Sequence, residues 1–204
     1  MSKSIRKKMF LLLITGFICF SGKAQSPSTD AVYNRYLDFN YQRSFGDKGK
    51  VMELGEKLLP DADKLPEKAR ISFYFSVGKM YEDNNQPDKA TPYFEMVAAA
   101  VPDYYVVHRA LGYIYLENLK QIGIKLNASS GNKALNANLT LAYNEAARKA
   151  LLHLEKAQAC DPSDETLAII KILYKNIKDV RALDSLNSRL SQLSKNCIDI
   201  LLDH

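Results

Sequence analysis

The chain has 204 residues, of which 47% are hydrophobic, enough for a packed core in one domain or one short array of repeats. Its nine glycines and seven prolines are few, and this balance favours helix over strand, so we expect an all-α protein. The formal charge of +5 comes from residues 1–24, which hold five basic residues and no acidic one. The rest of the chain is neutral, which gives no electrostatic indication of nucleic acid or anionic lipid as a partner.

Residues 1–24 have the three parts of a secretory signal peptide. A basic start precedes the apolar run MFLLLITGFICF, and Gly22 and Ala24 supply the small side chains of a cleavage site. We therefore expect an exported chain, periplasmic or secreted, whose mature part is a single domain over residues 25–204.

Two other interpretations of this segment are disfavoured. A retained anchor would need about 20 apolar residues to span a membrane, and the run is shorter, so we expect no integral span in the mature chain. Lipidation at Cys19 would need a small residue before the cysteine, where Ile18 stands.

The first pair of helices is expected within residues 29–60. One helix should run from about Thr29 to Arg43 and the next from about Lys48 to Leu59, with a Gly46-Asp47 turn between them. The stretch 60–66 begins and ends with proline and is predicted to be a loop.

A pattern with a period of 34 residues follows. The stretch VGKMY, with Gly78 and Tyr81, is answered by LGYIY, with Gly112 and Tyr115. A fixed period of this length is typical of stacked helix pairs.

The pattern resembles the tetratricopeptide repeat (TPR) family. In the unit 71–104 the family positions are held by Tyr74, Gly78, Tyr81, Ala90, Phe94 and Pro102. In the unit 105–164 they are held by Leu111, Gly112, Tyr115, Ala150, Leu154, Ala157 and Pro162. The resemblance implies a TPR-like α-solenoid of about four antiparallel helix pairs, with residues 29–60 and 165–203 as degenerate units.

The spacing has a physical reason within each pair. Gly78 and Ala90 are expected where the two helices approach most closely, with Tyr81 and Phe94 filling the space beside them. Pro102 ends the second helix. An ordinary bundle of helical hairpins, without stacking into a superhelix, is the alternative.

The unit 105–164 carries an insertion near residues 119–145. Its flanks have helical composition and ASSGN interrupts them, so we expect two lengthened helices joined by a loop near Asn127 to Lys133. Each arm gains about 10 residues, or about 15 Å. The projecting hairpin is either a partner-binding arm or a tolerated solvent-facing extension.

The last unit, residues 165–203, should end in a helix with a coiled-coil type of seam. The seam consists of Leu183, Leu186, Leu190, Leu193, Cys197 and Ile200. Such a helix either covers the end of the array or supports self-association, so a homo-oligomer is possible.

Cys160 and Cys197 are both expected near helix ends. In an exported protein they can form a disulfide, or they can remain two buried thiols.

No catalytic or metal-binding motif is present. His108 and His153 lack the spacing of metal ligands and are interpreted as fillers between helices. We expect a protein that is not an enzyme and that has no metal and no cofactor.

The family resemblance also implies a concave groove lined by the first helices of successive units. The inward positions are Phe75, Lys79, Glu82, Arg109, Tyr113 and Leu116. The expected function is a scaffold that binds a protein or peptide through this groove, the projecting hairpin, or both. The alternatives are an unused groove and a structural subunit of the cell envelope that self-assembles through the last-helix seam.

Overall fold

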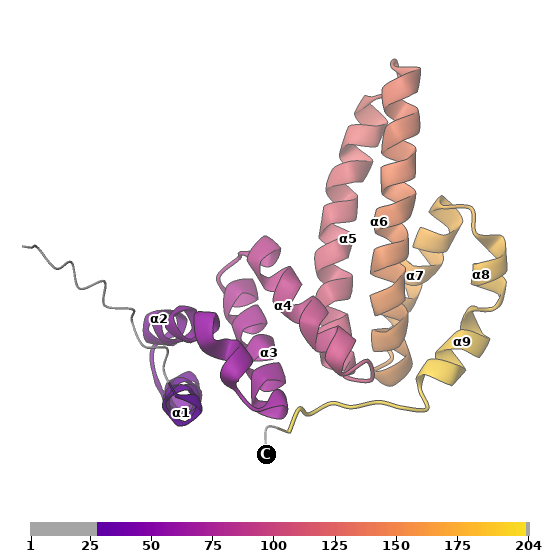
Figure 1. The fold of residues 1–204 in the computed structure, drawn as a ribbon. Helices are drawn as coiled ribbons and strands as arrows, with labels where there is room; N and C mark the ends of the chain where they lie inside the picture. Colours follow the sequence, from indigo (N-terminus) through magenta and orange to yellow (C-terminus); the bar gives the residue numbers. More distant parts are fainter. Residues whose placement is uncertain (1–27, 203–204) are drawn as a thin grey trace, which may run out of the picture.

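A computed structural model describes residues 28–202, and within this range the chain is all-α, with no β-strand (Figure 1). The elements are α1 (Thr29–Phe45), α2 (Lys48–Leu58), the 3₁₀ helix η1 (Leu59–Lys64), α3 (Glu67–Asp83), α4 (Pro87–Ala100), α5 (Tyr105–Ala128), α6 (Lys133–Cys160), α7 (Asp164–Asn176), α8 (Val180–Asp184) and α9 (Leu186–Leu193). The expected signal peptide 1–24, including Cys19, and residues 203–204 lie outside the described residues. In the described part, no helix is both long and apolar enough to cross a membrane.

Side-chain caps mark the start of five helices. Each cap accepts a hydrogen bond from the backbone N–H three residues later, which satisfies a donor that the helix itself cannot pair. The caps are Ser28, Asp47, Asn132, Ser163 and Asp179. Because the caps are encoded locally, the boundaries of α1 and α2 lie close to those expected. The predicted loop 60–66 differs, since η1 occupies most of it.

The two glycines of the 34-residue period make equivalent contacts. A Cβ atom on Gly78 would lie 2.5 Å from the ring of Phe94 on α4, and one on Gly112 would lie 2.8 Å from Leu154 on α6. Phe94 and Leu154 occupy equivalent positions in their helix pairs, so each glycine admits the equivalent side chain of its paired helix. The side chain that packs on Gly78 is Phe94, which was expected beside this contact, and Ala90 is fully buried.

The first helix pair contains the same contact with the sizes exchanged. A Cβ atom on Gly55 of α2 would lie 3.2 Å from the ring of Phe39 on α1. Phe39 and Gly55 each precede Gly78 and Phe94 by 39 residues, so here the first helix carries the phenylalanine and the second carries the glycine. This offset aligns α1 and α2 with α3 and α4.

Neighbouring pairs are joined by a recurring hydrogen bond. A tyrosine hydroxyl on the first helix of a pair donates to a glutamate on the second helix of the preceding pair. The three bonds are Tyr81 to Glu56, Tyr115 to Glu95 and Tyr174 to Glu155. Successive pairs are therefore held to one another by the same contact.

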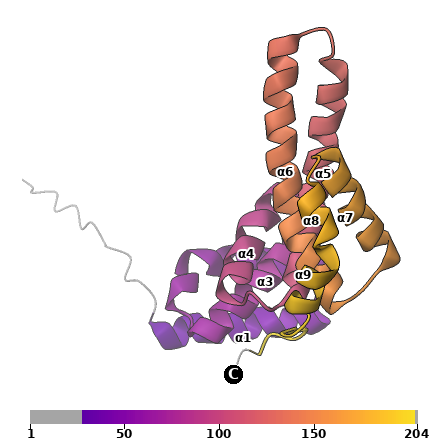
Figure 2. The same ribbon diagram turned by 90° about the vertical axis from the view of Figure 1, so that its right-hand side faces the viewer.

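The buried residues form two clusters. One contains α1 to α4 and the first part of α5, and the other contains the middle of α5 with α6, α7 and α9. Tyr115 packs against both clusters and links them. Beyond the second cluster, α5 and α6 extend as a two-helix hairpin that projects from the rest of the molecule (Figures 1 and 2). The two helices are joined by residues 129–132, within the predicted loop.

The predicted last helix and its seam are wrong. After α7 the chain forms two short helices, α8 and α9, and α9 ends at Leu193. Cys197 and Ile200 therefore lie beyond the last helix, and Leu186 is the one buried member of the proposed seam. The ends are stabilised by side chains: Arg189 donates to the carbonyl oxygen of Ala182, and Lys156 donates to that of Leu193.

Residues 194–202, here called the C-terminal strap, leave α9 and return to the turn between α4 and α5 (Figure 1). The Ile198 N–H donates to the carbonyl oxygen of Asp103 at 2.8 Å, and the Tyr105 N–H donates to that of Ile198 at 3.2 Å. Leu201 packs against the first cluster. The strap thus connects the last unit to the first cluster.

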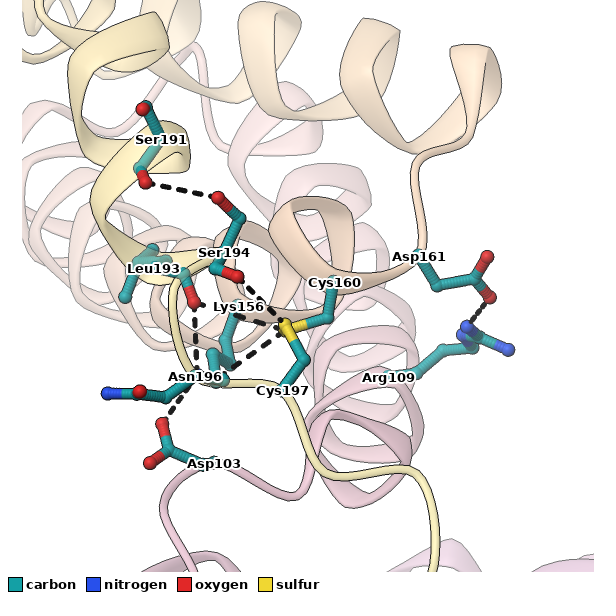
Figure 3. Close-up of a disulfide and its surroundings, with 10 residues drawn as sticks. All are labelled: Asp103, Arg109, Lys156, Cys160, Asp161, Ser191, Leu193, Ser194, Asn196 and Cys197. Carbon is teal, nitrogen blue, oxygen red and sulfur yellow. Dashed lines mark hydrogen bonds and ion pairs between the residues drawn. A yellow bond between two sulfur atoms is a disulfide. The ribbon is translucent and has the colours of Figure 1, made fainter.

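A disulfide between Cys160 and Cys197 fastens the strap to the end of α6 (Figure 3). Beside it, the buried Lys156 ammonium donates to Asp103 at 2.7 Å and to the carbonyl oxygen of Asn196 at 2.5 Å. The sequence left two unpaired thiols as an alternative, and the structure has the disulfide instead.

Candidate groove across the first helices

Five of the six predicted groove residues line one pocket of about 470 Å³ between α3 and α5. These five are Phe75, Lys79, Glu82, Arg109 and Tyr113, and the pocket is completed by Val106 and Ala110. The sixth prediction was wrong. Leu116 is 9% exposed and belongs to the second core cluster, because its side of α5 is packed against neighbouring helices.

The bottom of this pocket is apolar and firmly packed. The Phe75 ring contacts the Tyr104 ring edge to face at 5.0 Å and lies 5.9 Å from the Phe94 ring. Burial raises the pKa of Tyr104 to about 12, so its hydroxyl stays neutral at physiological pH. With Val106 and Ala110 opposite, this bottom suits an apolar side chain of a ligand.

One side of the pocket carries charges that are paired within α3. Lys79 Nζ lies 2.5 Å from Glu82 Oε2 and 3.3 Å from Asp83 Oδ1. Burial alone would lower the pKa of Lys79, but the hydrogen bonds and charges of the two carboxylates outweigh burial and raise it. Lys79 is therefore a permanent cation that a ligand carboxylate could share with Glu82.

The other side is held by contacts between units. Arg109 forms an ion pair with Asp161 at the end of α6, and its guanidinium lies 5.4 Å from the centre of the Tyr105 ring. Tyr113 and Thr166, on α5 and α7, are joined by a hydrogen bond of 3.0 Å between their hydroxyls. These contacts orient two of the groove residues.

A second, smaller pocket continues the first. It has a volume of about 230 Å³, and it shares Arg109 and Tyr113 with the 470 Å³ pocket. Its other lining residues are Ala157, Asp161, Ser163 and Thr166. We call the two pockets together the groove, which runs from α3 across α5 to the start of α7.

The sequence predicted the groove residues on α3 and most of those on α5, and it missed those at the end of α6 and the start of α7. Asp161 and Thr166 come from the end of α6 and the start of α7, and the 26-residue insertion hides their distance from Tyr113. Val106 and Ala110 are ordinary helix residues, and nothing in their spacing identifies them as pocket residues.

The sequence also missed a contact between His108, which is buried, and His153, which is half-buried. His108 and His153 face each other with 3.0 Å between their Nδ1 atoms, so one ring must donate to the other. Burial and the neighbouring His108 lower the pKa of His153 to about 4, and burial and Lys156 lower that of His108. Among the described residues, no group of three or more His, Cys, Asp or Glu could hold a metal ion.

A pocket of about 520 Å³ lies between α6, α7 and α9. Its buried Glu155 is bound by Arg189 through both carboxylate oxygens, at 2.9 and 2.6 Å, and accepts from Tyr174. Arg148, on its edge, pairs with Asp179 at 2.9 Å. Because these charged groups are already paired with one another, we assign them to holding α8 and α9 against α6.

Comparisons with known proteins leave the family open. The chain matches no family model, no curated protein and no solved structure.

Proposed function

We propose that this protein is an exported, non-enzymatic TPR-like scaffold that binds a protein or peptide partner through the groove. The stacked units would form an α-solenoid, and the groove would be its concave wall. The partner segment would be extended, with an apolar side chain seated on Phe75 and charged groups beside Lys79 and Arg109.

One observation carries the proposal: five of the six residues that the family resemblance implied as groove positions come together around one pocket of the folded chain. Its composition also supports peptide binding. The apolar bottom would contribute affinity, and the charged rim would contribute orientation and specificity. The projecting hairpin remains a second contact region in this proposal, since Ile124 and Leu141 are exposed on it.

Site-specific crosslinking tests the groove directly. A photoreactive phenylalanine analogue replaces Ala110, inside the groove, or Leu152, which is exposed on α6 outside the groove. The proteins are irradiated in cells, and the adducts are identified by mass spectrometry. We expect an adduct with a distinct protein from position 110 and none with that protein from position 152.

Charge reversal then tests specificity. In the Lys79→Glu/Arg109→Glu variant the adduct from position 110 should fall at least about tenfold, because both cations on the rim are lost. The control Lys171→Glu reverses an exposed charge on α7 that lines neither pocket of the groove and lies outside the hairpin, and it should leave the adduct unchanged. Equal adducts from positions 110 and 152, or an adduct that the groove variant leaves intact, would refute binding through the groove.

A further inference from the structure

The outer face of α1 is an apolar surface at the end of the molecule opposite α8 and α9 (Figure 1). Leu37, Tyr41 and Phe45 are spaced by four residues and so share one face of the helix. They are 48%, 61% and 80% exposed, and the rings of Tyr41 and Phe45 are 5.4 Å apart. We call these three residues the α1 stripe.

The position of Tyr41 is covered in every later pair. The offsets that align the pairs place Tyr41 in the position of three other residues, namely Met80, Ile114 and Leu173. These three are only 7%, 8% and 4% exposed. Met80, for example, packs against Gly55 of the preceding pair. The Tyr41 position at the centre of the α1 stripe is thus a contact position between units, and on α1 it has no preceding unit against it.

Helix α9, at the opposite end of the molecule, does not supply the missing contact. The exposed residues of α9 are polar: Asn187, Ser188, Ser191 and Gln192. A polar outer face is what the terminal unit of a repeat array needs for solubility. Head-to-tail stacking of copies, with α9 of one on α1 of the next, would place this polar face on the stripe.

The chain before α1 is short if the proposed export is right, and on this point the inference rests on the proposed function. Removal of residues 1–24 leaves three residues before Ser28. Covering the stripe, which spans more than two helical turns, would take a helix of about 10 residues. Three residues are too few to form such a helix, so another molecule is the candidate for the cover.

We propose that the α1 stripe is a homodimer surface, in which two copies of α1 pack antiparallel around a two-fold axis at Tyr41. In that arrangement the two Tyr41 rings meet, and Leu37 of each copy lies opposite Phe45 of the other. Asp38 lies opposite Ser44 of the other copy, so no like charges are brought together. The stripe is therefore complementary to itself, as a two-fold interface requires.

A contact made by one helix from each copy is small. It falls below the roughly 1,200 Å² of standard protein interfaces, so the dimer should be weak and dependent on concentration. Sedimentation velocity over a wide concentration range measures this. The protein is expressed with its own N-terminal segment and purified after processing, and its first residue is determined by mass spectrometry. We expect a reversible monomer–dimer equilibrium.

Matched variants locate the surface. Tyr41→Glu should raise the dimer dissociation constant at least about tenfold, because it places two carboxylates at the two-fold axis. Leu141→Glu alters a residue of similar exposure on the hairpin and should leave the constant unchanged. Circular dichroism melts confirm that both variants are folded, as expected for changes at exposed positions.

A crosslink tests the geometry independently. Tyr41→Cys should give a disulfide-linked dimer on mild oxidation, whereas Leu141→Cys should remain monomeric. The proposal is overturned if the protein stays monomeric, or if a dimer forms that Tyr41→Glu leaves intact. It is also overturned if Tyr41→Glu removes binding to a different protein while the chain itself never dimerises. The groove is not involved, so its crosslinks from position 110 should persist in Tyr41→Glu.

Discussion

At the scale of single residues, the contact between Gly78 and Phe94 shows why the repeat needs glycine. Phe94 is fully buried and packs against the ring of Phe75, so it has no space to move away from a new side chain. The glycine is required by close packing between two helices, since no glycine in the described residues has a positive φ angle.

Gly78→Ala should therefore destabilise the protein, by about 1–3 kcal/mol, even though alanine is the better helix former. Chemical denaturation measures the loss. Gly131→Ala is the control, because nothing lies within 4 Å of that site, and its stability should change by less than about 0.5 kcal/mol. With Phe94→Leu already present, Gly78→Ala should cost less. Equal stability of both alanine variants would contradict the close contact.

The two histidines occupy positions that hold tyrosines in the preceding pair. His108 and His153 lie 34 and 60 residues after Tyr74 and Tyr93, and their rings make corresponding contacts at 5.0 and 6.0 Å. Tyr115 stacks on His153, with ring centres 5.6 Å apart, as Tyr81 stacks on Tyr93. One unit thus contains a titratable version of an aromatic cluster.

The presence of histidines in place of tyrosines predicts that the stability of the fold falls in acid. The pKa of His153 is about 4 in the folded chain and about 6.5 when unfolded, so the unfolded state binds more protons between these values. The stabilising contribution is complete above about pH 6.5 and is lost as the pH falls through about 4. Thermal melts should show a larger decrease between about pH 7 and pH 5 for the wild type than for His153→Tyr. Parallel decreases would contradict the assignment.

At the scale of elements, the structure shows where sequence patterns were sufficient. The Gly-Asp turn and the ASSGN break are local signals, and they placed the junction of α1 with α2 and that of α5 with α6 close to the predicted residues. The long hairpin follows from the same signals.

The last helix could not be predicted in this way, because its end depends on distant residues. In a continuing helix the carbonyl oxygen of Leu193 would accept from the N–H of residue 197, but here it accepts from Lys156, 37 residues away. The leucine spacing from Leu183 to Ile200 is compatible with a helix, and tertiary contacts determine the outcome. The pairing of Cys160 with Cys197 depends on the same return of the chain.

Removing the disulfide should loosen this region first. A bridge that closes a loop of this length contributes roughly 3–4 kcal/mol, so Cys160→Ser/Cys197→Ser should lower the free energy of unfolding by about that amount. Hydrogen exchange should show faster exchange of the Ile198 and Tyr105 amides, with α3 unchanged. Lys156→Met, which keeps the disulfide, should produce a smaller effect. Unchanged exchange in the double variant would show that the strap is held without the bridge.

At the scale of the whole molecule, the 34-residue period predicted the two middle pairs, and the family resemblance that it supports implied five residues that meet in the groove. The period did not identify the first helix pair, in which the glycine and the phenylalanine of the contact are exchanged between the two helices. The repeat pattern places the glycine on the first helix of each pair. It also failed at Leu116, where the position along α5 is correct but the neighbouring helices bury the side chain. Spacing along one helix cannot specify what packs against it.

The two ends of the molecule differ in how far the apolar residues of their helices are buried, and the sequence pattern does not distinguish the two cases. Both Tyr41 and Leu190 look like members of apolar stripes, yet Tyr41 is exposed on α1 while Leu190 packs partly against the second cluster. Whether a stripe is interior depends on whether another unit follows it.

The disulfide between Cys160 and Cys197 connects the strap covalently to the end of α6 and bypasses the helices between them. A pulling force applied from the C-terminal side would pass from the strap straight into α6, and α7, α8 and α9 would carry none of it. If the protein is tethered at that end in the cell envelope, the last three helices would stay folded under tension until α6 itself yields.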